Sequence, residues 1–202
     1  MKVLLATPLY NGSADREFIQ GLLQCQGLYY GWSCFEGQAN ISIARDLLVA
    51  EFLQTDCTTM VFIDGDIGFT RADLEALLES PHTITAGLYP RKRQSKSWVA
   101  VPLPGGEEIR DHAAPVRVKR VGAGFLRIER RVFEDLIASG ACPASNWEQR
   151  PVHHFFPTGL FEGEFLSEDY YFCELARRAG HEIHIDPRIR LKHAGRIIYT
   201  GI

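Results

Sequence analysis

The chain has 202 residues, of which 46% are hydrophobic and 23% are charged, and its formal net charge is −3. These values exclude a disordered chain, and the slightly acidic total argues against a generic nucleic-acid binder. No run of 18 consecutive apolar residues occurs, and the five cysteines contain no CxxC pair. The sequence therefore predicts no membrane span, no disulfide framework and no zinc site, and a reduced, cytoplasmic setting is expected.

The first ninety residues alternate between apolar runs of strand length and amphipathic helical patterns. The segment 59–63 is a continuous apolar run, typical of a strand buried on both faces. Thr70-Arg71-Ala72-Asp73 resembles a capping box and predicts a helix start. Strands are predicted at 3–7, 28–35, 59–63 and 82–88, and helices after Ser13 or Asp15, over 41–52 and from Thr70.

The second half of the chain has a more mixed pattern. Segments 102–115 and 140–163 are loop-like, the first of them alternatively a hairpin. Strands are predicted at 117–121, 125–128 and 184–185, the last ending at Pro187, and helices at 130–138 and from Ser167 to Arg178. Together the patterns predict one α/β domain over 1–202, with a central, mostly parallel sheet flanked by helices and a smaller mixed portion.

The net charge is unevenly distributed along the chain. Residues 1–82 carry 4 basic and 11 acidic side chains, a balance of −7, whereas residues 83–202 carry 18 basic and 14 acidic ones, a balance of +4. An acidic half facing a basic half could hold a divalent cation and a phosphorylated ligand between them. The alternative is that charged side chains are distributed unevenly over the surface without a functional role.

The sharpest motif is Asp64-Gly65-Asp66, which directly follows the predicted strand 59–63. Ligands bind at the carboxyl ends of strands in open α/β sheets. Because side chains alternate along an extended chain, Asp64 and Asp66 can point the same way, and Gly65 lets a ligand approach the backbone. Two converging carboxylates repel one another unless a cation joins them, so the motif predicts a divalent metal ion. The alternative is a turn in which Asp and Gly serve only as turn formers.

Two later features also carry titratable side chains. Glu168 and Asp169 open a predicted helix, where acids either complement the helix dipole or face a cleft as a base for an acceptor hydroxyl. His193 follows the last predicted strand and is either structural or a metal ligand. An imidazole beside two carboxylates suits manganese better than magnesium.

The order in which Asp64-Gly65-Asp66, Glu168-Asp169 and His193 follow one another along the chain resembles that in glycosyltransferases of the GT-A fold. The resemblance is to family 2-like and mannosyltransferase-like members. The resemblance covers roughly residues 3–195 and rests on the order and spacing of short motifs. It implies a GT-A, Rossmann-like domain in which about 1–90 form the nucleotide-sugar-binding half and about 91–202 the acceptor-side half. The activity it implies is a metal-dependent transfer of a sugar, such as a hexose, from a UDP- or GDP-sugar to an acceptor hydroxyl.

The resemblance also implies roles for single residues of this sequence. Asp64 and Asp66 match the DxD motif, and His193 matches a late metal ligand, so the implied cofactor is a divalent ion, Mn²⁺ before Mg²⁺. Asp169 matches a general base, with Glu168 beside it in the acidic motif, and 122–125 resemble a strand lining the sugar and acceptor pocket. The residues matched to the nucleotide sugar are Thr7, Pro8, Tyr10, Arg45, Asp64, Gly65 and Asp66.

Other interpretations remain open from the sequence. A phosphatase of the haloacid-dehalogenase type also has DxD after a strand, but its motif normally lies near the N-terminus and has Thr or Val where this chain has Gly68. A non-catalytic nucleotide-sugar or nucleic-acid binding module is a second alternative, because basic grooves with aromatic rings bind single strands. Its aromatic residues would be Trp98, Phe125, Trp147, Phe155 and Phe156. The acceptor is a glycan, a small molecule or a hydroxylated base in DNA, and the donor sugar, the stereochemistry and the oligomeric state stay undetermined.

Overall fold

The structure is a computed structural model that describes residues 1–92, 97–106, 109, 112–195 and 199–200. Its main element is an eight-stranded sheet in the order β2-β1-β3-β8-β5-β13-β7-β6. β1 pairs in parallel with β2 and β3, and β5 with β13, whereas β8 and β7 are antiparallel to their neighbours. The strands are Val3–Leu9 (β1), Gly31–Glu36 (β2), Thr59–Ile63 (β3), Ile84–Leu88 (β5), Ala100–Pro102 (β6), Val116–Val121 (β7), Phe125–Glu129 (β8) and Ile183–Arg190 (β13).

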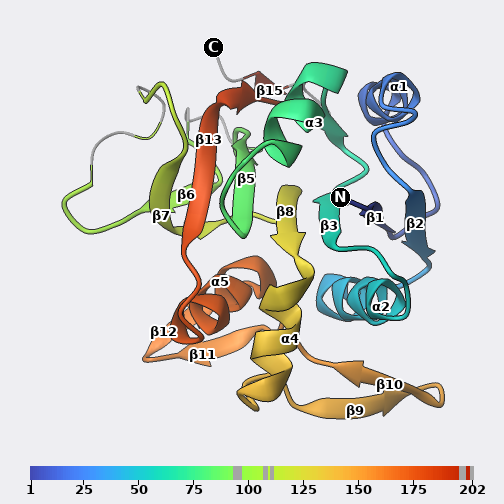
Figure 1. Ribbon diagram of the computed structural model, residues 1–202, viewed down its shortest axis with the longest axis vertical. Helices are drawn as coiled ribbons and strands as arrows, with labels where there is room; N and C mark the ends of the chain where they lie inside the picture. The colour runs from blue at the N-terminus through green and yellow to red at the C-terminus, as the bar shows by residue number, and fades with distance from the viewer. Residues whose placement is uncertain (93–96, 107–108, 110–111, 196–198, 201–202) are drawn as a thin grey trace.

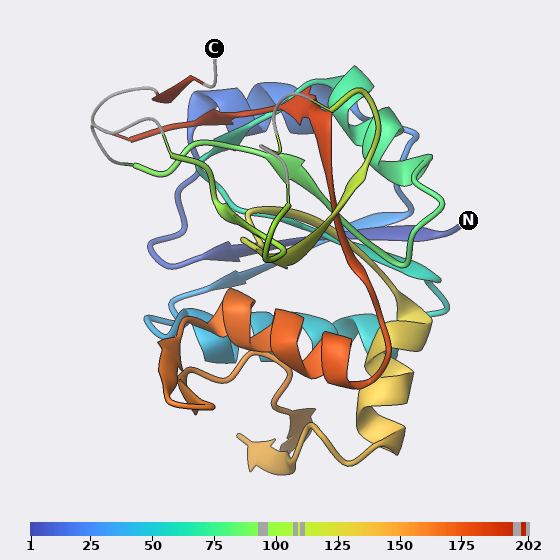
Figure 2. The ribbon, with the colours of Figure 1, turned by 90° about the vertical axis from the view of Figure 1, so that its left-hand side faces the viewer.

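Helices cover both faces of this sheet (Figure 1). α1 and α3 pack on one face through residues such as Phe18 and Leu74. α2, α4 and α5 pack on the other face, where Phe52, Phe133 and Phe172 join one apolar cluster. Figure 2 shows the sheet edge-on between these two helical layers. The helices are Arg16–Gln24 (α1), Ile41–Leu53 (α2), Arg71–Leu78 (α3), Arg130–Ala138 (α4) and Glu168–Arg178 (α5).

The predicted mixed α/β fold class is thereby confirmed at the level of a large, mostly one-directional sheet between helices, an arrangement compatible with a Rossmann-like fold. The predicted capping box is also confirmed: the Thr70 hydroxyl accepts from the Asp73 N–H, and the Asp73 carboxylate accepts from the Thr70 N–H. All five residues of β3 are buried, as the apolar run predicted. None of the helices in the described part is long and apolar enough to cross a bilayer.

The prediction that 140–163 is loop-like is wrong, because this segment contributes to two hairpins. The first pairs Ala144–Trp147 (β9) with Arg150–His153 (β10), and the second pairs Gly159–Phe161 (β11) with Glu164–Leu166 (β12). Glu148 and Gln149, between β9 and β10, both have positive φ angles of 47° and 68°. Tight hairpin turns need this left-handed backbone, and Asn-Gly is the sequence that usually signals it. Because Glu148-Gln149 is not such a signal, the turn could not be predicted from the sequence.

The predicted end of the strand at 184–185 is also wrong, since β13 continues through Pro187 to Arg190. Proline lacks an N–H and is normally confined to edges and bulges of sheets. β7 pairs with β13 only over 183–185, and the pairing with β5 shifts register between Asp186 and Arg190. Pro187 therefore lies where the ladder is already interrupted.

A buried carboxylate on α2 fixes the segment that follows β10. Asp46 is 2% exposed. Its Oδ1 accepts from the N–H groups of Phe155 and Phe156 at 2.9 and 3.0 Å, and its Oδ2 lies 3.1 Å from His154 Nδ1. Both phenylalanine rings enter the apolar cluster under the sheet. Asp46 thus connects α2 to the segment that completes this core.

Replacing Asp46 by Ala is expected to lower the free energy of unfolding by about 2–4 kcal/mol relative to Asp46→Asn, measured by urea denaturation. Ala leaves two buried N–H groups without an acceptor, and each such group costs about 1–3 kcal/mol. Asn keeps an oxygen that accepts from both. Equal stability of the two variants would show that these bonds contribute nothing.

The same carboxylate makes stability depend on pH. Burial raises the pKa of Asp46 from 3.8 to about 6, because the anion is disfavoured in the core more than its hydrogen bonds favour it. The folded chain therefore binds this proton more tightly than the unfolded chain. The contribution of Asp46 protonation to the free energy of unfolding is thus largest below about pH 4 and is lost as the pH rises through 6. We expect the wild type to lose about 2 kcal/mol against Asp46→Asn between pH 4 and 7. Parallel pH curves for the two proteins would contradict this.

Candidate functional site

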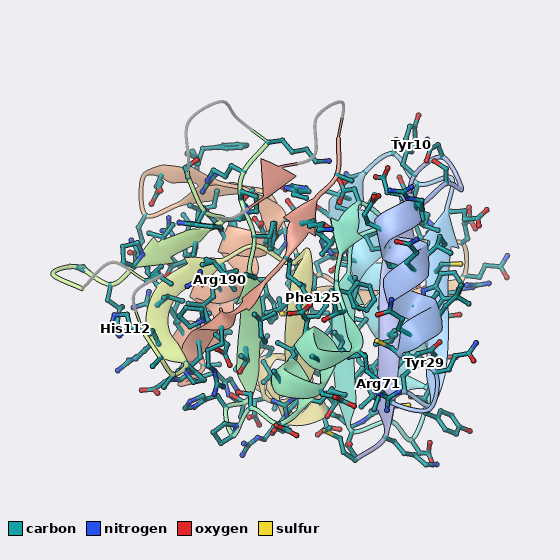
Figure 3. The ribbon with its side chains drawn as sticks, turned by 90° about the horizontal axis from the view of Figure 1, so that it is seen from above. Tyr10, Tyr29, Arg71, His112, Phe125 and Arg190 are labelled. Atoms are coloured by element: carbon teal, nitrogen blue, oxygen red, sulfur yellow. The ribbon has the colours of Figure 1, made fainter. Side chains whose placement is uncertain are left out.

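A pocket of about 410 Å³ lies where several strands of the main sheet end. The segments after β1 and β3 line it, with Lys92 from the segment after β5 and two residues that follow β14. Figure 3 shows Tyr10 at this end of the molecule and Tyr29 and Arg71 at the opposite end. The lining residues are Pro8, Leu9, Tyr10, Asn11, Ser13, Ala14, Asp15, Ile41, Asp64, Gly65, Asp66, Lys92, Ala194 and Gly195.

The Asp64-Gly65-Asp66 loop is held on both sides by backbone hydrogen bonds. Asp64 N–H donates to Gly124 O at 3.0 Å, and Gly65 O accepts from Asp15 N–H at 2.7 Å. A Cβ at Gly65 would lie 2.6 Å from Leu9 Cδ2, so Leu9 would have to move for any other residue. The loop therefore sits close against the end of β1, and its two carboxylates line one pocket.

A short ladder brings His193 to this loop across more than one hundred residues of sequence. Ile67–Gly68 (β4) pairs with Lys192–His193 (β14), which also pairs with Tyr199–Thr200 (β15). Ala194 N–H then donates to Asp66 O at 2.7 Å. His193 Nε2 consequently lies 3.5 Å from Asp66 Oδ2.

The surroundings of His193 determine which of its ring nitrogens faces Asp66. His193 Nδ1 lies 2.8 Å from Pro90 O, and because a carbonyl only accepts, Nδ1 carries the proton. In the neutral ring Nε2 then presents a lone pair toward the Asp66 carboxylate. Burial raises the pKa of Asp66, but hydrogen bonds from Lys92 and from the cationic form of His193, in which Nε2 also carries a proton, outweigh it and leave that pKa below its ordinary value.

Arg45 on α2 joins Asp64 to Glu168 at the start of α5. Its side chain is only 3% exposed, and its Nη2 donates to Asp64 Oδ1 and Oδ2 at 2.9 and 3.1 Å. Its Nε lies 3.5 Å from Glu168 Oε1. Burial raises the pKa of Asp64, and Arg45 offsets part of that rise. Burial and the neighbouring Asp169 likewise raise the pKa of Glu168.

The start of α5 holds Asp169 in a fixed position. Its Oδ1 accepts from the Ser167 hydroxyl and, at 2.8 Å, from the Tyr170 N–H. Within the described residues no hydrogen bond to Oδ2 is formed, so this oxygen is free to accept a proton. Arg120 on β7 anchors the same region by binding Glu174 Oε1 at 2.6 Å and both oxygens of Glu164 at 2.8 Å.

The other sequence-predicted residues divide into those that reach the pocket and those that do not. Pro8 and Tyr10 line it, and 67% of Tyr10 is exposed. Thr7 is fully buried, and its hydroxyl accepts from Trp32 Nε1 at 3.0 Å instead of facing the pocket. The turn at 122–124 packs on Tyr89, since the Gly124 N–H donates to its hydroxyl at 2.9 Å and a Cβ at Gly124 would lie 2.8 Å from it.

The three residues predicted as metal ligands are not assembled as a three-ligand group. Among the described residues no three His, Cys, Asp or Glu side chains stand together so as to hold an ion. Asp64 is engaged by Arg45. Asp66 and His193 alone fit as a pair, because two ligands of one ion, each at roughly 2.1 Å, lie about 3.0–3.5 Å apart.

Lys92, whose ammonium group binds Asp66 Oδ2, belongs to the basic stretch 91–96, of which 93–96 lie outside the described residues. From the sequence, this stretch and the basic stretch 188–196 could either stabilise the charge of a departing diphosphate or screen an acidic pocket, and the alternative for the first stretch was a solvated surface loop. The sequence did not single out Lys92 within its stretch. In the second basic stretch, 188–196, Arg188 is bound to Asp186 at 2.6 Å, and Arg196 is not among the described residues.

The aromatic residues that favoured a single-strand-binding module do not form an exposed platform. Phe125, Phe155 and Phe156 are at most 1% exposed and belong to the core. Trp98 packs against a core cluster and is only partly exposed, and Trp147 on β9 is also only partly exposed. The stacking argument for nucleic-acid binding is therefore wrong for Phe125, Phe155 and Phe156, whose rings are buried.

Comparison with known proteins shows that the fold of this chain is similar to that of solved structures. No protein-family model and no curated protein matches the sequence. The solved structure of A197 from STIV matches with a TM-score of 0.61 and 15% identity, over 100% of this chain and 95% of that chain. The structure of GalNAc-T7 with UDP, GalNAc and Mn²⁺ matches with a TM-score of 0.53 and 14% identity, over 98% of this chain and 44% of that one. At this identity, the chain is similar to a glycosyltransferase structure in its fold.

Proposed function

We propose that the chain is a metal-dependent glycosyltransferase of the GT-A type that moves a sugar from a nucleotide-diphosphate sugar to an acceptor hydroxyl. The observation that carries the proposal is a line of charged groups that includes Asp64 and Asp66 of the pocket lining. It runs from His193 and Asp66 through Asp64 and Arg45 to Glu168 at the start of α5. A transferase needs both a site for a departing diphosphate and an acid–base group for the acceptor, and this line joins two such sites.

The donor half would be the pocket beside β1 and β3. Its exposed Tyr10 ring offers a flat surface on which a base can stack, and Pro8 and Ile41 add apolar walls. Gly65 lines the same pocket, with Leu9 packed on the side toward which a Cβ would point. A UDP- or GDP-sugar is the expected donor, in keeping with the UDP in the GalNAc-T7 structure.

Asp66 and His193 would hold the divalent ion, with manganese favoured because one ligand is an imidazole. When bound, such an ion stabilises the negative charge that grows on the departing diphosphate. Pro90 O keeps the proton on His193 Nδ1, which turns the Nε2 lone pair toward the ion position. Arg45 holds Asp64 in place at the edge of the same pocket.

The acceptor half would be the start of α5. Asp169 Oδ2 takes the proton of the attacking hydroxyl, while Ser167 and the Tyr170 N–H hold Oδ1 and so orient the carboxylate. Glu168 stays bound to Arg45, which couples the position of α5 to that of Asp64. The acceptor itself carries at least one hydroxyl, and no described feature favours DNA.

A phosphatase of the haloacid-dehalogenase type is disfavoured by the state of Asp64. That reaction needs the first carboxylate of the motif as a free nucleophile. Both oxygens of Asp64 instead accept from a buried guanidinium group. A nucleophile held in this way would be a weak one.

Slow release of UDP or GDP from a nucleotide sugar tests the proposal without a known acceptor, because water can replace the acceptor hydroxyl. We expect release that needs Mn²⁺ and that falls at least about 100-fold in Asp66→Ala, since a group that binds the ion contributes several kcal/mol. Asp56→Ala, an exposed acid paired with Lys2 near the start of β1, is the matched control and should keep wild-type release. Equal release from wild type and Asp66→Ala would overturn the proposal.

A further inference from the structure

Lys92 is the one basic side chain that lines the pocket among the described residues. Its ammonium group binds Asp66 Oδ2, the same oxygen that lies 3.5 Å from His193 Nε2. A monovalent cation of this chain thus occupies the neighbourhood in which an ion shared by Asp66 and His193 would lie.

The backbone beside Lys92 is fixed, while its own side chain has room to move. Arg91 N–H donates to Ser97 O at 2.8 Å, Pro90 bridges to Trp98, and the Arg91 side chain binds Tyr170 Oη and Trp98 O. The Lys92 side chain is 37% exposed and ends in a flexible four-carbon stem. It can therefore leave Asp66 and still reach an anion in the same pocket.

Asp66 supplies a reason for a cation at this place. Its side chain is only 33% exposed, and it lines the pocket together with a second carboxylate, that of Asp64, so a positive charge beside it is favoured. Lys92 supplies one such charge. A divalent ion would supply a larger one and would bind Asp66 and His193 directly.

We propose that Lys92 is a resident counter-cation, which occupies Asp66 when no divalent ion is bound and moves to the donor's diphosphate when the ion takes its place. Lys92 competes with the ion for Asp66 and then contributes to donor binding. It is a binding and positioning residue with opposite effects on the two ligands. The second step rests on the proposed function, whereas the first depends only on Asp66, His193 and Lys92.

The first step is tested by Mn²⁺ binding without any nucleotide, followed by electron paramagnetic resonance of free Mn²⁺. Lys92→Met keeps the length of the side chain and removes its charge, and we expect it to bind Mn²⁺ about three- to tenfold more tightly than wild type. Lys2→Met removes another Lys–Asp pair, that with Asp56, and should leave Mn²⁺ affinity unchanged. In Asp66→Asn the Lys92→Met change should have no further effect.

The second step is tested with UDP and with GDP at saturating Mn²⁺, by isothermal titration calorimetry. Lys92→Met is expected to weaken binding of the favoured nucleotide about three- to tenfold, opposite in sign to its effect on Mn²⁺. Unchanged or weaker Mn²⁺ binding in Lys92→Met would overturn the proposal, and so would unchanged nucleotide binding. If neither nucleotide binds the wild type while the gain in Mn²⁺ affinity is seen, the proposed function fails and the competition for Asp66 stands.

Discussion

Arg45→Met is expected to lower the free energy of unfolding by about 3–5 kcal/mol, because removing one partner of a buried ion pair leaves the other uncompensated. Arg45 is 3% exposed and neutralises Asp64 and Glu168 together. Met fills a similar volume but donates no hydrogen bond, so both carboxylates lose their common counter-charge. Chemical denaturation at neutral pH measures the loss.

Two further variants separate charge from packing at this position. Arg45→Met combined with Asp64→Asn and Glu168→Gln removes all three charges and is expected to recover most of the lost stability. Arg71→Met removes an exposed arginine paired with Glu75 at the opposite end of the molecule and should cost under about 1 kcal/mol. If Arg45→Met costs no more than Arg71→Met, the buried arginine does not hold the site together.

Asp169→Asn is expected to reduce the rate of sugar transfer by about 10²–10⁴-fold while leaving donor binding within about twofold of wild type. Asn keeps an oxygen that can accept from Ser167 and the Tyr170 N–H, so the start of α5 stays in place. It lacks the second carboxylate oxygen that would take the proton. Single-turnover kinetics with an identified acceptor, beside calorimetric donor binding, measure the two effects.

Glu168→Gln is the comparison that assigns the roles of the two neighbouring acids. Glu168 lies beside Arg45, so its loss should shift the position of α5 and reduce transfer less than the loss of Asp169 does. A larger loss of transfer in Glu168→Gln than in Asp169→Asn would exchange the two roles. Full activity of Asp169→Asn would remove Asp169 from the mechanism.

The fold was predictable where sequence pattern and local energetics agree. β3 follows from a five-residue apolar run, and α3 follows from a capping box that satisfies its first N–H groups. The hairpin at Glu148–Gln149 was not predictable, because residues that rarely adopt positive φ occupy its turn. The course of β13 through Pro187 depends on a register shift that only the paired strands define.

The candidate site was predictable in its parts but not in its pairings. A strand end followed by Asp64 and Asp66 already predicted two acids at one edge of the sheet. That Arg45 binds Asp64 and Lys92 binds Asp66 depends on side chains of three separate elements meeting in the folded chain. The two-residue ladder between β4 and β14, which brings His193 to Asp66, is too short to leave a sequence pattern.

The position of Thr7 was not predictable either. The resemblance matched Thr7 to the nucleotide sugar, yet one residue decides which side of a strand a side chain faces. Thr7 turns inward to Trp32, whereas its neighbour Pro8 lines the pocket. The charge division that the sequence showed has a local counterpart, since acidic Asp66 of the first half meets Lys92 and His193 of the second.

Metal-dependent binding of a nucleotide sugar is the central claim, and a thermal-shift panel tests it most directly. UDP-, GDP-, ADP-, CMP- and dTDP-sugars would each be added with Mn²⁺ and with a chelator, to wild type and to Asp66→Ala. At ligand concentrations near 100 times the dissociation constant, binding stabilises by about 2.7 kcal/mol, a rise of several degrees in melting temperature. We predict such a rise for at least one nucleotide sugar, in wild type with Mn²⁺ only. No rise with any of them, or the same rise with chelator or in Asp66→Ala, would contradict the claim.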